Sequence, residues 1–367
     1  MSQQNHFAGS VDTAWLAAHT EDILEPGLPI VDPHHHLWVA NGQPYLLPEL
    51  LADLGSGHDI RATVFAECHA MYRADGPEEW RSLGETEFVT GVSAMAASGT
   101  FGPTRVCAAM VGNVGLRLGE RVRPLLEAHL VASGHRFRGV RFSTAWDPSE
   151  RLHRAAPEPE LLRDARVRAG VACLGPLGLS LDVWVYHPQL DEVAELAAEF
   201  PDTTIVLNHI GVPILGGPYA GRRDEVLAAW RSALARVARH PNVVLKVGAI
   251  PIRVPGTAGV SSRPGASASA LAAPADIPAL RPATPPPSSE TVAAAWKPFV
   301  ETCIELFGAD RCMFESNFPV QTRFCSYQVV WNAFKRLAAG ASADEKRALF
   351  AGTAVRAYRL PPGLIAT

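Results

Sequence analysis

Apolar and polar residues follow one another along this chain in a pattern that predicts alternating strands and helices. Eight short runs are rich in β-forming residues, which is typical of buried strands. Their residue ranges are 30–36, 62–69, 106–111, 137–143, 179–187, 203–211, 242–247 and 311–317. The segments between them carry apolar residues at intervals of three and four, as one face of a helix does. The clearest of these helical segments are 117–132, 190–200, 222–239 and 293–307.

The order of these elements predicts the fold class. Strict alternation of strands and helices implies a parallel sheet, and eight such units predict an α/β protein with a (β/α)8, or TIM, barrel. The strand starts are mostly 24 to 44 residues apart, and only the last gap, of 69 residues, is longer. We therefore expect one barrel domain over residues 30–360, after an N-terminal extension (1–29) and before a short tail (361–367).

The long gap lies after the seventh strand and holds a segment of unusual composition. Residues 251–290 include nine prolines, six serines and no aromatic residue. This Pro/Ser/Ala-rich composition has too little apolar surface to fold alone, so we predict a flexible insertion that serves as a lid or spacer, or an inert linker. Beyond the insertion, Ser342 to Glu345 form a capping box, which predicts a closing helix that runs to about Tyr358.

Composition and charge exclude several classes of protein. Hydrophobic residues make up 47% of the chain and charged residues 19%, which excludes a wholly disordered chain. The net charge is −4 and no basic patch is present, so a nucleic-acid partner is not indicated. No apolar run is long enough to span a membrane. The six scattered cysteines and the lack of a secretory signal favour a cytoplasmic protein, and a homo-oligomer is left open.

Polar residues gather at the predicted carboxyl ends of the strands, where (β/α)8 barrels place their chemistry. Five of the thirteen histidines lie there. The residues are His34 and His36 on the first strand, Glu67 and His69 on the second, Arg141 on the fourth, His187 on the fifth, His209 on the sixth, Lys246 on the seventh, and Glu315 and Asn317 on the eighth. These positions predict a single site at the mouth of the barrel.

The stretch VDPHHHLW, residues 31–38, is the most informative part of this set. If it is a strand, the side chains of Asp32, His34 and His36 share one face and His35 lies on the other. Two imidazoles on one face suit a metal ion or acid–base chemistry, although histidines at a strand end can also be plain hydrogen-bond partners.

Three other strand-end residues also have plainer interpretations beside a functional one. Arg141 is either a clamp for a substrate carboxylate or one half of an internal ion pair. Lys246 could be a rim lysine with its stem packed, and Glu67 a structural partner of a histidine.

Several stretches of the chain resemble the amidohydrolase superfamily, in particular its amidohydrolase-2 branch of metal-dependent TIM-barrel hydrolases. They run in order from about residue 28 to 360 and read VDPHHHLW, FRGVRF, VYHPQL, VLNHIGVP, VVLKVGA and FGADRCMFESNFPV. The resemblance implies that His34 and His36 are the family's HxH pair and that His187 and His209 are its fifth- and sixth-strand histidines. Members of this branch act on lactones and relatives decarboxylate aromatic acids. Some of them hold one zinc ion and others work without metal.

The chain departs from the family pattern on the eighth strand. The family usually has Gly-Ser-Asp-Trp-Pro, in which Asp is the general base or a metal ligand, and this chain has ESNFP at residues 315–319. The amide of Asn317 cannot take a proton from water. We hypothesise that Glu315, two residues earlier and on the same face, supplies the displaced carboxylate. The alternative is that Glu315 is a buried partner of Lys246 or of a histidine.

Taken with the resemblance, these residues predict a hydrolase of a small lactone or related carbonyl compound, which could carry a carboxylate. His34, His36 and His187 would hold one divalent ion, with zinc expected, although a metal-free mechanism in which the histidines and Arg141 polarise the carbonyl is also open. His209 would be a further ligand or a substrate contact. Residues expected in the catalytic step are His187, His209, Glu315 and Asn317, and those expected to bind substrate are Arg141, His209, Glu67 and Lys246.

Two other functions fit the same scaffold. The first is a decarboxylase, another lyase or an isomerase. The second is a non-catalytic barrel that binds a metabolite after losing its general base, a reading favoured by Asn317.

Overall fold

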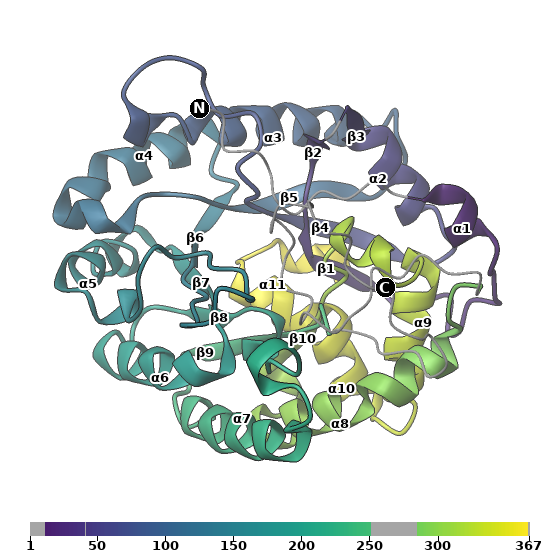
Figure 1. The fold of residues 1–367 in the computed structure, drawn as a ribbon. Coiled ribbons are helices and arrows are strands. Elements are labelled where there is room, and N and C mark those ends of the chain that lie inside the picture. The colour runs from purple at the N-terminus through teal and green to yellow at the C-terminus, as the bar shows by residue number, and fades with distance from the viewer. Residues whose placement is uncertain (1–11, 41, 251–284, 366–367) are drawn as a thin grey trace.

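The computed structural model describes residues 12–40, 42–250 and 285–365. Eight parallel strands form one sheet in the order β1-β4-β5-β6-β7-β8-β9-β10 (Figure 1). Their bounds are Ile30–His35 (β1), Ile60–Ala66 (β4), Arg105–Gly112 (β5), Phe137–Ser143 (β6), Ser180–Trp184 (β7), Ile205–Leu207 (β8), Val243–Val247 (β9) and Cys312–Phe314 (β10). A bridge between His35 and Phe318 joins the last edge to the first. The predicted (β/α)8 barrel is confirmed.

Helices surround the strands in Figure 1, and α11 lies inside their ring. Their bounds are Thr13–Ala17 (α1), Leu47–Leu54 (α2), Leu83–Ala97 (α3), Arg123–Ala132 (α4), Ala165–Val171 (α5), Leu190–Glu199 (α6), Arg223–Ala238 (α7), Ser289–Phe307 (α8), Tyr327–Leu337 (α9), Ala343–Arg347 (α10) and Thr353–Ala357 (α11). The capping box at Ser342 and Glu345 is present as predicted. No helix among the described residues has the length and apolarity needed to cross a bilayer.

Some predicted boundaries differ from the structure. The sixth strand was expected to reach residue 211 but ends at Leu207, because His209 and Ile210 adopt left-handed backbone angles that a strand cannot hold. A short hairpin of β2 (Trp38–Ala40) and β3 (Gln43–Tyr45) was not predicted. Residues 251–284 of the predicted insertion lie outside the described residues, and Ser289 and Glu290, at its end, already belong to α8.

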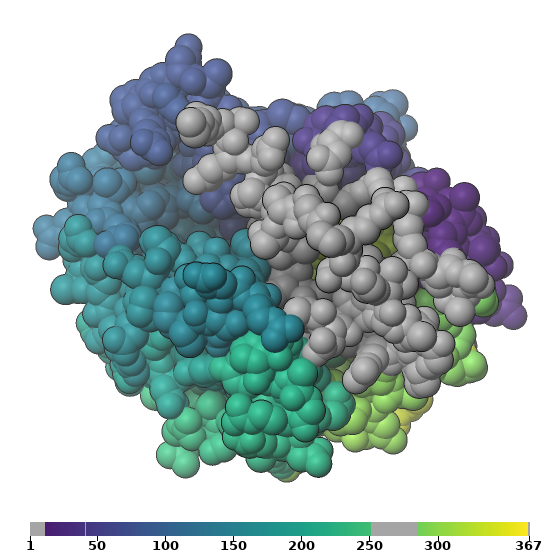
Figure 2. Space-filling model, in the orientation of Figure 1, coloured from purple at the N-terminus to yellow at the C-terminus, as the bar shows by residue number. Residues whose placement is uncertain are grey.

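The N-terminal residues before β1 pack against α9, which is far away in sequence. The Glu21 N–H donates to Gln328 Oε1 at 3.2 Å, and the Leu24 N–H donates to Asn332 Oδ1 at 2.9 Å. Figure 2 shows this purple N-terminal segment beside the green surface of the later helices. Residues 12–29 of the predicted extension are therefore anchored to the barrel by hydrogen bonds.

Two apolar layers hold the barrel. Outward strand residues such as Val183 and Leu207 pack under the helices, whereas inward ones such as Val64 and Val206 pack on α11 and the residues after it. The closing segment therefore fills the amino-terminal end of the barrel, and its Tyr358 is fully buried. The barrel interior is a packed core, and in such barrels the chemistry lies at the carboxyl ends of the strands.

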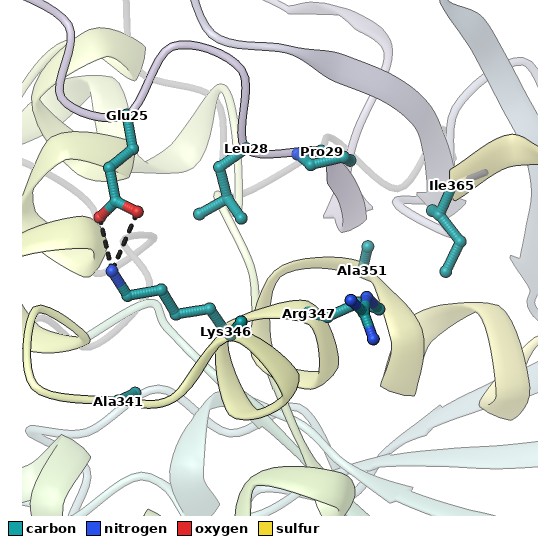
Figure 3. A pocket seen from close by; sticks show the side chains of 9 residues that line it. Glu25, Leu28, Pro29, Ala341, Lys346, Arg347, Ala351 and Ile365 are labelled. Atoms are coloured by element: carbon teal, nitrogen blue, oxygen red, sulfur yellow. Dashed lines mark hydrogen bonds and ion pairs between the residues drawn. The ribbon is translucent and has the colours of Figure 1, made fainter. Parts of the chain in front are cut away.

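A pocket of about 350 Å³ lies at the amino-terminal end, next to the entry into β1. Leu28, Pro29, Ala351 and Ile365 provide apolar lining, and both carboxylate oxygens of Glu25 accept from Lys346 Nζ (Figure 3). None of the residues predicted to carry chemistry lines this pocket.

Strand β1 contains a bulge that changes which side chains share a face. Asp32 pairs with Thr63 of β4 and His35 pairs with Phe65, so three residues of β1 span two of its neighbour. Asp32 consequently shares the outward face with His35, and the prediction that it lies with His34 and His36 is wrong. Proline is common at bulges, and Pro33 stands between Asp32 and His34.

The outward carboxylate of Asp32 ties the first strand to the last one. Its Oδ2 accepts from Ser316 Oγ at 2.5 Å and from Tyr327 OH at 3.0 Å, and its Oδ1 accepts from Ser316 N at 3.1 Å. The backbone adds two bonds, from Asn317 N to His34 O and from His36 N to Phe318 O. Asp32 therefore helps to close the barrel directly beneath the histidines.

Replacement of Asp32 by alanine should destabilise the protein by about 3 kcal/mol or more, because the buried donors of Ser316 and Tyr327 lose their acceptor. Urea unfolding measures this loss. Ser342→Ala, which removes one capping bond at an exposed helix start, should cost much less. Equal losses for the two variants would contradict the closing role of Asp32.

Candidate active site

The end of β1 points two imidazoles at each other. His34 Nε2 and His36 Nε2 lie 3.3 Å apart, with the two rings edge to face. His36 Nδ1 donates to the carbonyl of Ala66 at 2.8 Å, so its Nε2 carries a free lone pair when the ring is neutral. Its ring also stacks on Trp38. The predicted proximity of His34 and His36 is confirmed.

Glu315 lies between His34 and His209. Its Oε1 accepts from His209 Nδ1 at 2.6 Å. Its Oε2 is 2.9 Å from His34 Nδ1, but among the described residues no hydrogen-bond donor points at this buried oxygen. The rings of His34 and His209 are 4.6 Å apart. Both strand-end histidines therefore converge on one carboxylate with an unsatisfied oxygen.

A glycine on the neighbouring strand makes room for Glu315. A Cβ at Gly248, which directly follows β9, would lie 2.4 Å from Glu315 Cγ and 2.5 Å from Glu315 O. Real Cβ atoms do not approach so closely, so glycine at this position permits the conformation of Glu315.

The three residues could hold a metal ion. His34, His209 and Glu315 each offer a ligand atom, and these atoms all lie within 4.8 Å of one another. Two imidazoles and one carboxylate are a donor set that suits a catalytic divalent metal. The unsatisfied Glu315 Oε2 fits this view, because a buried carboxylate oxygen without a donor is costly unless a cation faces it. The ligand set expected from the sequence was His34, His36 and His187, with His209 as a further ligand or a substrate contact, and that set stays a prediction.

A second polar network lies directly under His34. Lys246 Nζ, which is fully buried, donates to Asp182 Oδ2 at 2.8 Å and lies 3.2 Å from His34 Nδ1. Asn208 Nδ2 and Tyr358 OH donate to the same Asp182 oxygen. Lys246 is fully buried, as are His34 and Glu315, and its predicted role in substrate binding stays a prediction.

Arg141 is part of an internal ion pair. Its Nη1 donates to Glu67 Oε1 and to the Glu67 carbonyl, both at 3.2 Å, and its Nε donates to Asn208 Oδ1 at 3.0 Å. Glu67 Oε2 lies 3.4 Å from His69 Nε2. The plainer interpretations of Arg141 and Glu67 are thus present in the structure, and their roles as substrate contacts stay predictions.

His187 and Asn317 take positions at the edge of the site. His187 Nδ1 accepts from the Ile214 N–H at 3.3 Å, so a neutral His187 carries its proton on Nε2 and lacks a lone pair for a metal. This hydrogen bond opposes the predicted ligand role, which remains a prediction. Asn317 has φ of 54°, and its backbone bonds to His34 and Gln321.

Burial keeps the imidazoles neutral. It lowers the pKa of His34 and of His36 well below 6.5, and the nearby charges of Lys246 on His34 and of Arg141 on both rings act in the same direction. Burial also lowers the pKa of His209, although Glu315 opposes this shift. The pKa of His187 falls to about 4 for the same reason. Neutral imidazoles are able to bind a metal or to accept a proton.

Sequence reasoning missed Asp182, Asn208 and Tyr358 as parts of the site. Asp182 is the one charged residue within the apolar run LSLDVWV and faces the barrel interior, and that isolated carboxylate was the available signal. No comparable sequence feature marked Tyr358, because it directly follows the closing helix α11 and is remote in sequence from every strand end.

Comparison with known proteins places this chain in a family. The sequence model of the amidohydrolase family matches residues 31–360. L-fucono-1,5-lactonase of Burkholderia multivorans is 26% identical over 349 residues, which cover 90% of this chain and 96% of the lactonase. A protein of Sinorhizobium fredii described as uncharacterized is 29% identical over 353 residues, covering 90% of this chain and 98% of that protein.

A solved structure agrees with this assignment. The crystal structure of an amidohydrolase from Burkholderia multivorans with bound zinc has 25% sequence identity and a TM-score of 0.62, covering 90% of this chain and 99% of that one. The barrel fold, the strand-end histidines and the match over residues 31–360 together show that this chain belongs to the amidohydrolase family.

Proposed function

We propose that this enzyme hydrolyses the ester bond of a small lactone, with Glu315 and His209 as the groups that activate water. The observation that carries the proposal is the Glu315 carboxylate, buried between His34 and His209 with its Oε2 unsatisfied. The similarity to a lactonase over nearly the whole chain supports the same reaction class.

The Glu315 carboxylate determines the state of His209. Because Glu315 Oε1 accepts the Nδ1 proton, the neutral His209 ring keeps a lone pair on Nε2, which can bind an ion or take a proton from water. Protonation of Nε2 would be stabilised by the adjacent carboxylate at 2.6 Å. A carboxylate-oriented imidazole of this kind can serve as a general base at neutral pH.

We propose that His34, His209 and Glu315 would hold one divalent ion, for which zinc is our expectation. Such an ion, when bound, supplies a Lewis acid for the carbonyl and lowers the pKa of water. Independently of it, the Nε2–H of His187 and the guanidinium of Arg141 are donors that could orient the lactone oxygens. His36 would hold its partner His34 in place at 3.3 Å.

Glu315→Gln should reduce kcat for lactone hydrolysis about 100-fold or more, because the amide neither accepts the His209 proton as well nor takes one from water. The assay uses a panel of lactones together with aromatic carboxylic acids. Glu192→Gln, which alters a buried carboxylate on α6, serves as the matched control and should leave kcat close to that of the parent.

Metal analysis of protein purified without chelator should find about one ion per chain in the parent and less in Glu315→Gln.

The outcomes of this panel separate the alternatives. Carbon dioxide release from the acids without lactone hydrolysis would support a decarboxylase on the same barrel. Full lactonase turnover by Glu315→Gln would overturn the role of this carboxylate.

Gly248→Ala should displace Glu315, because the new methyl group would overlap Glu315 Cγ. We expect a loss of activity of about 10-fold or more, as for other changes that move a supporting residue of a metal or catalytic site, with circular dichroism close to that of the parent. Gly340→Ala, which meets no atom within 4 Å, is the control. An unchanged kcat in Gly248→Ala would show that the position of Glu315 is not critical.

The acidic limb of the pH profile should lie below pH 6.5. The neutral imidazoles are the active forms, and burial lowers the pKa of His34, His36 and His209 from 6.5, so activity persists as the pH falls through 6.5 and declines only at lower pH. Initial rates of kcat/KM from acidic to neutral pH measure this limb. A midpoint above 6.5 would instead indicate an imidazole with an ordinary or raised pKa.

A further inference from the structure

Tyr358 reaches the active site from the opposite end of the barrel. It follows α11, packs with the inward-facing strand residues and is fully buried. Its hydroxyl donates to Asp182 Oδ2 at 2.8 Å, and its ring lies 5.2 Å from the ammonium of Lys246. Tyr358 therefore contacts both members of the ion pair beneath His34 without touching His34 itself.

Asp182 Oδ2 is the common point of this network. It accepts from Lys246 Nζ at 2.8 Å, from Tyr358 OH at 2.8 Å and from Asn208 Nδ2 at 3.0 Å. Asp182 Oδ1 has no hydrogen-bond partner within the part of the chain that the structure describes. Three donors on a single oxygen fix the orientation of the carboxylate, and the carboxylate in turn fixes the end of the long lysine side chain.

The position of Lys246 bears on the protonation pattern of His34. Lys246 Nζ lies in hydrogen-bond geometry 3.2 Å from His34 Nδ1, whereas Glu315 Oε2 is nearer, at 2.9 Å, but outside hydrogen-bond direction. If His34 Nδ1 accepts from Lys246, the ring proton sits on Nε2 and points to His36 Nε2. A shift of Lys246 away from His34 would remove the donor that keeps the ring proton on Nε2, so that Nδ1 could carry the proton instead.

We propose that, while no ion is bound to His34, Tyr358 is a positioning residue that, through Asp182, holds Lys246 against His34 Nδ1 and thereby selects the tautomer of His34. Its effect on turnover rests on the proposed hydrolase function, whereas its effect on the His34 ring does not. The closing segment would then support the active site as well as fill the amino-terminal end of the barrel.

Tyr358→Phe tests the proposal with little change in packing. The expected result is a fall in kcat of about 10-fold with KM nearly unchanged, because supporting contacts to an active-site histidine typically have effects of this size and Tyr358 lies beneath the mouth. Tyr45→Phe is the matched control, since the buried Tyr45 donates from its OH to Oδ2 of the partly buried Asp53, at 2.6 Å. A merely structural hydroxyl would lower the melting temperature of both variants and leave both kcat values alone, which would overturn the proposal.

A double-mutant cycle with Lys246→Met tests whether the effect travels through the lysine. If it does, Tyr358→Phe should cause no further fall in kcat in the Lys246→Met background. A full additional loss would show that Tyr358 acts by another route and would overturn the proposal.

A spectroscopic measurement keeps this proposal separate from the hydrolase function. In metal-free protein, the ring nitrogen shifts of His34, assigned with a His34→Gln variant, should report protonated Nε2 in the parent and in Tyr45→Phe, and a changed tautomer in Tyr358→Phe. This readout needs no substrate, so a parent that hydrolyses no lactone would refute the function while the ring shifts still decide the role of Tyr358. Identical His34 shifts in the parent and Tyr358→Phe would overturn that role.

Discussion

The buried carboxylate of Glu315 is the interaction on which the rest of this site depends. A carboxylate without exposed surface is tolerated only where donors or cations compensate it. Here His209 satisfies one oxygen and the other is left facing His34. Three features of the fold allow this arrangement: Gly248 leaves the space, the bulge at Pro33 turns His34 inward, and Asp32 fastens Ser316, the residue after Glu315, to the first strand.

Much of the fold could be predicted because buried parallel strands are continuous apolar runs and their helices repeat every three to four residues. The range 137–143 was correct at both ends. What failed depends on backbone geometry that periodicity does not report. A period of two cannot anticipate the extra residue at Pro33, which moved Asp32 to the outward face, nor the left-handed turn at His209 that ended β8 early.

The site itself was predictable one strand at a time, but its pairings were not. Each strand end could be searched for histidines and carboxylates, and His34, His209 and Glu315 all came from that search. Which of them meet depends on the height at which each strand stops and on the closure between β1 and β10. The contact between Asp182 and Tyr358 exists because the closing helix packs inside the barrel. No local sequence pattern predicts that packing.

The exchange of residues on the last strand has a physical logic. The family usually places glycine where this chain has Glu315 and aspartate where it has Asn317. Asn317 adopts a left-handed φ of 54°, which asparagine tolerates better than most residues, and its backbone bonds to His34 and Gln321. The turn thus gives a structural reason for asparagine at this position, and the predicted catalytic role of Asn317 stays a prediction. The carboxylate of Glu315, two residues earlier, is accommodated because Gly248, which directly follows β9, lacks a side chain.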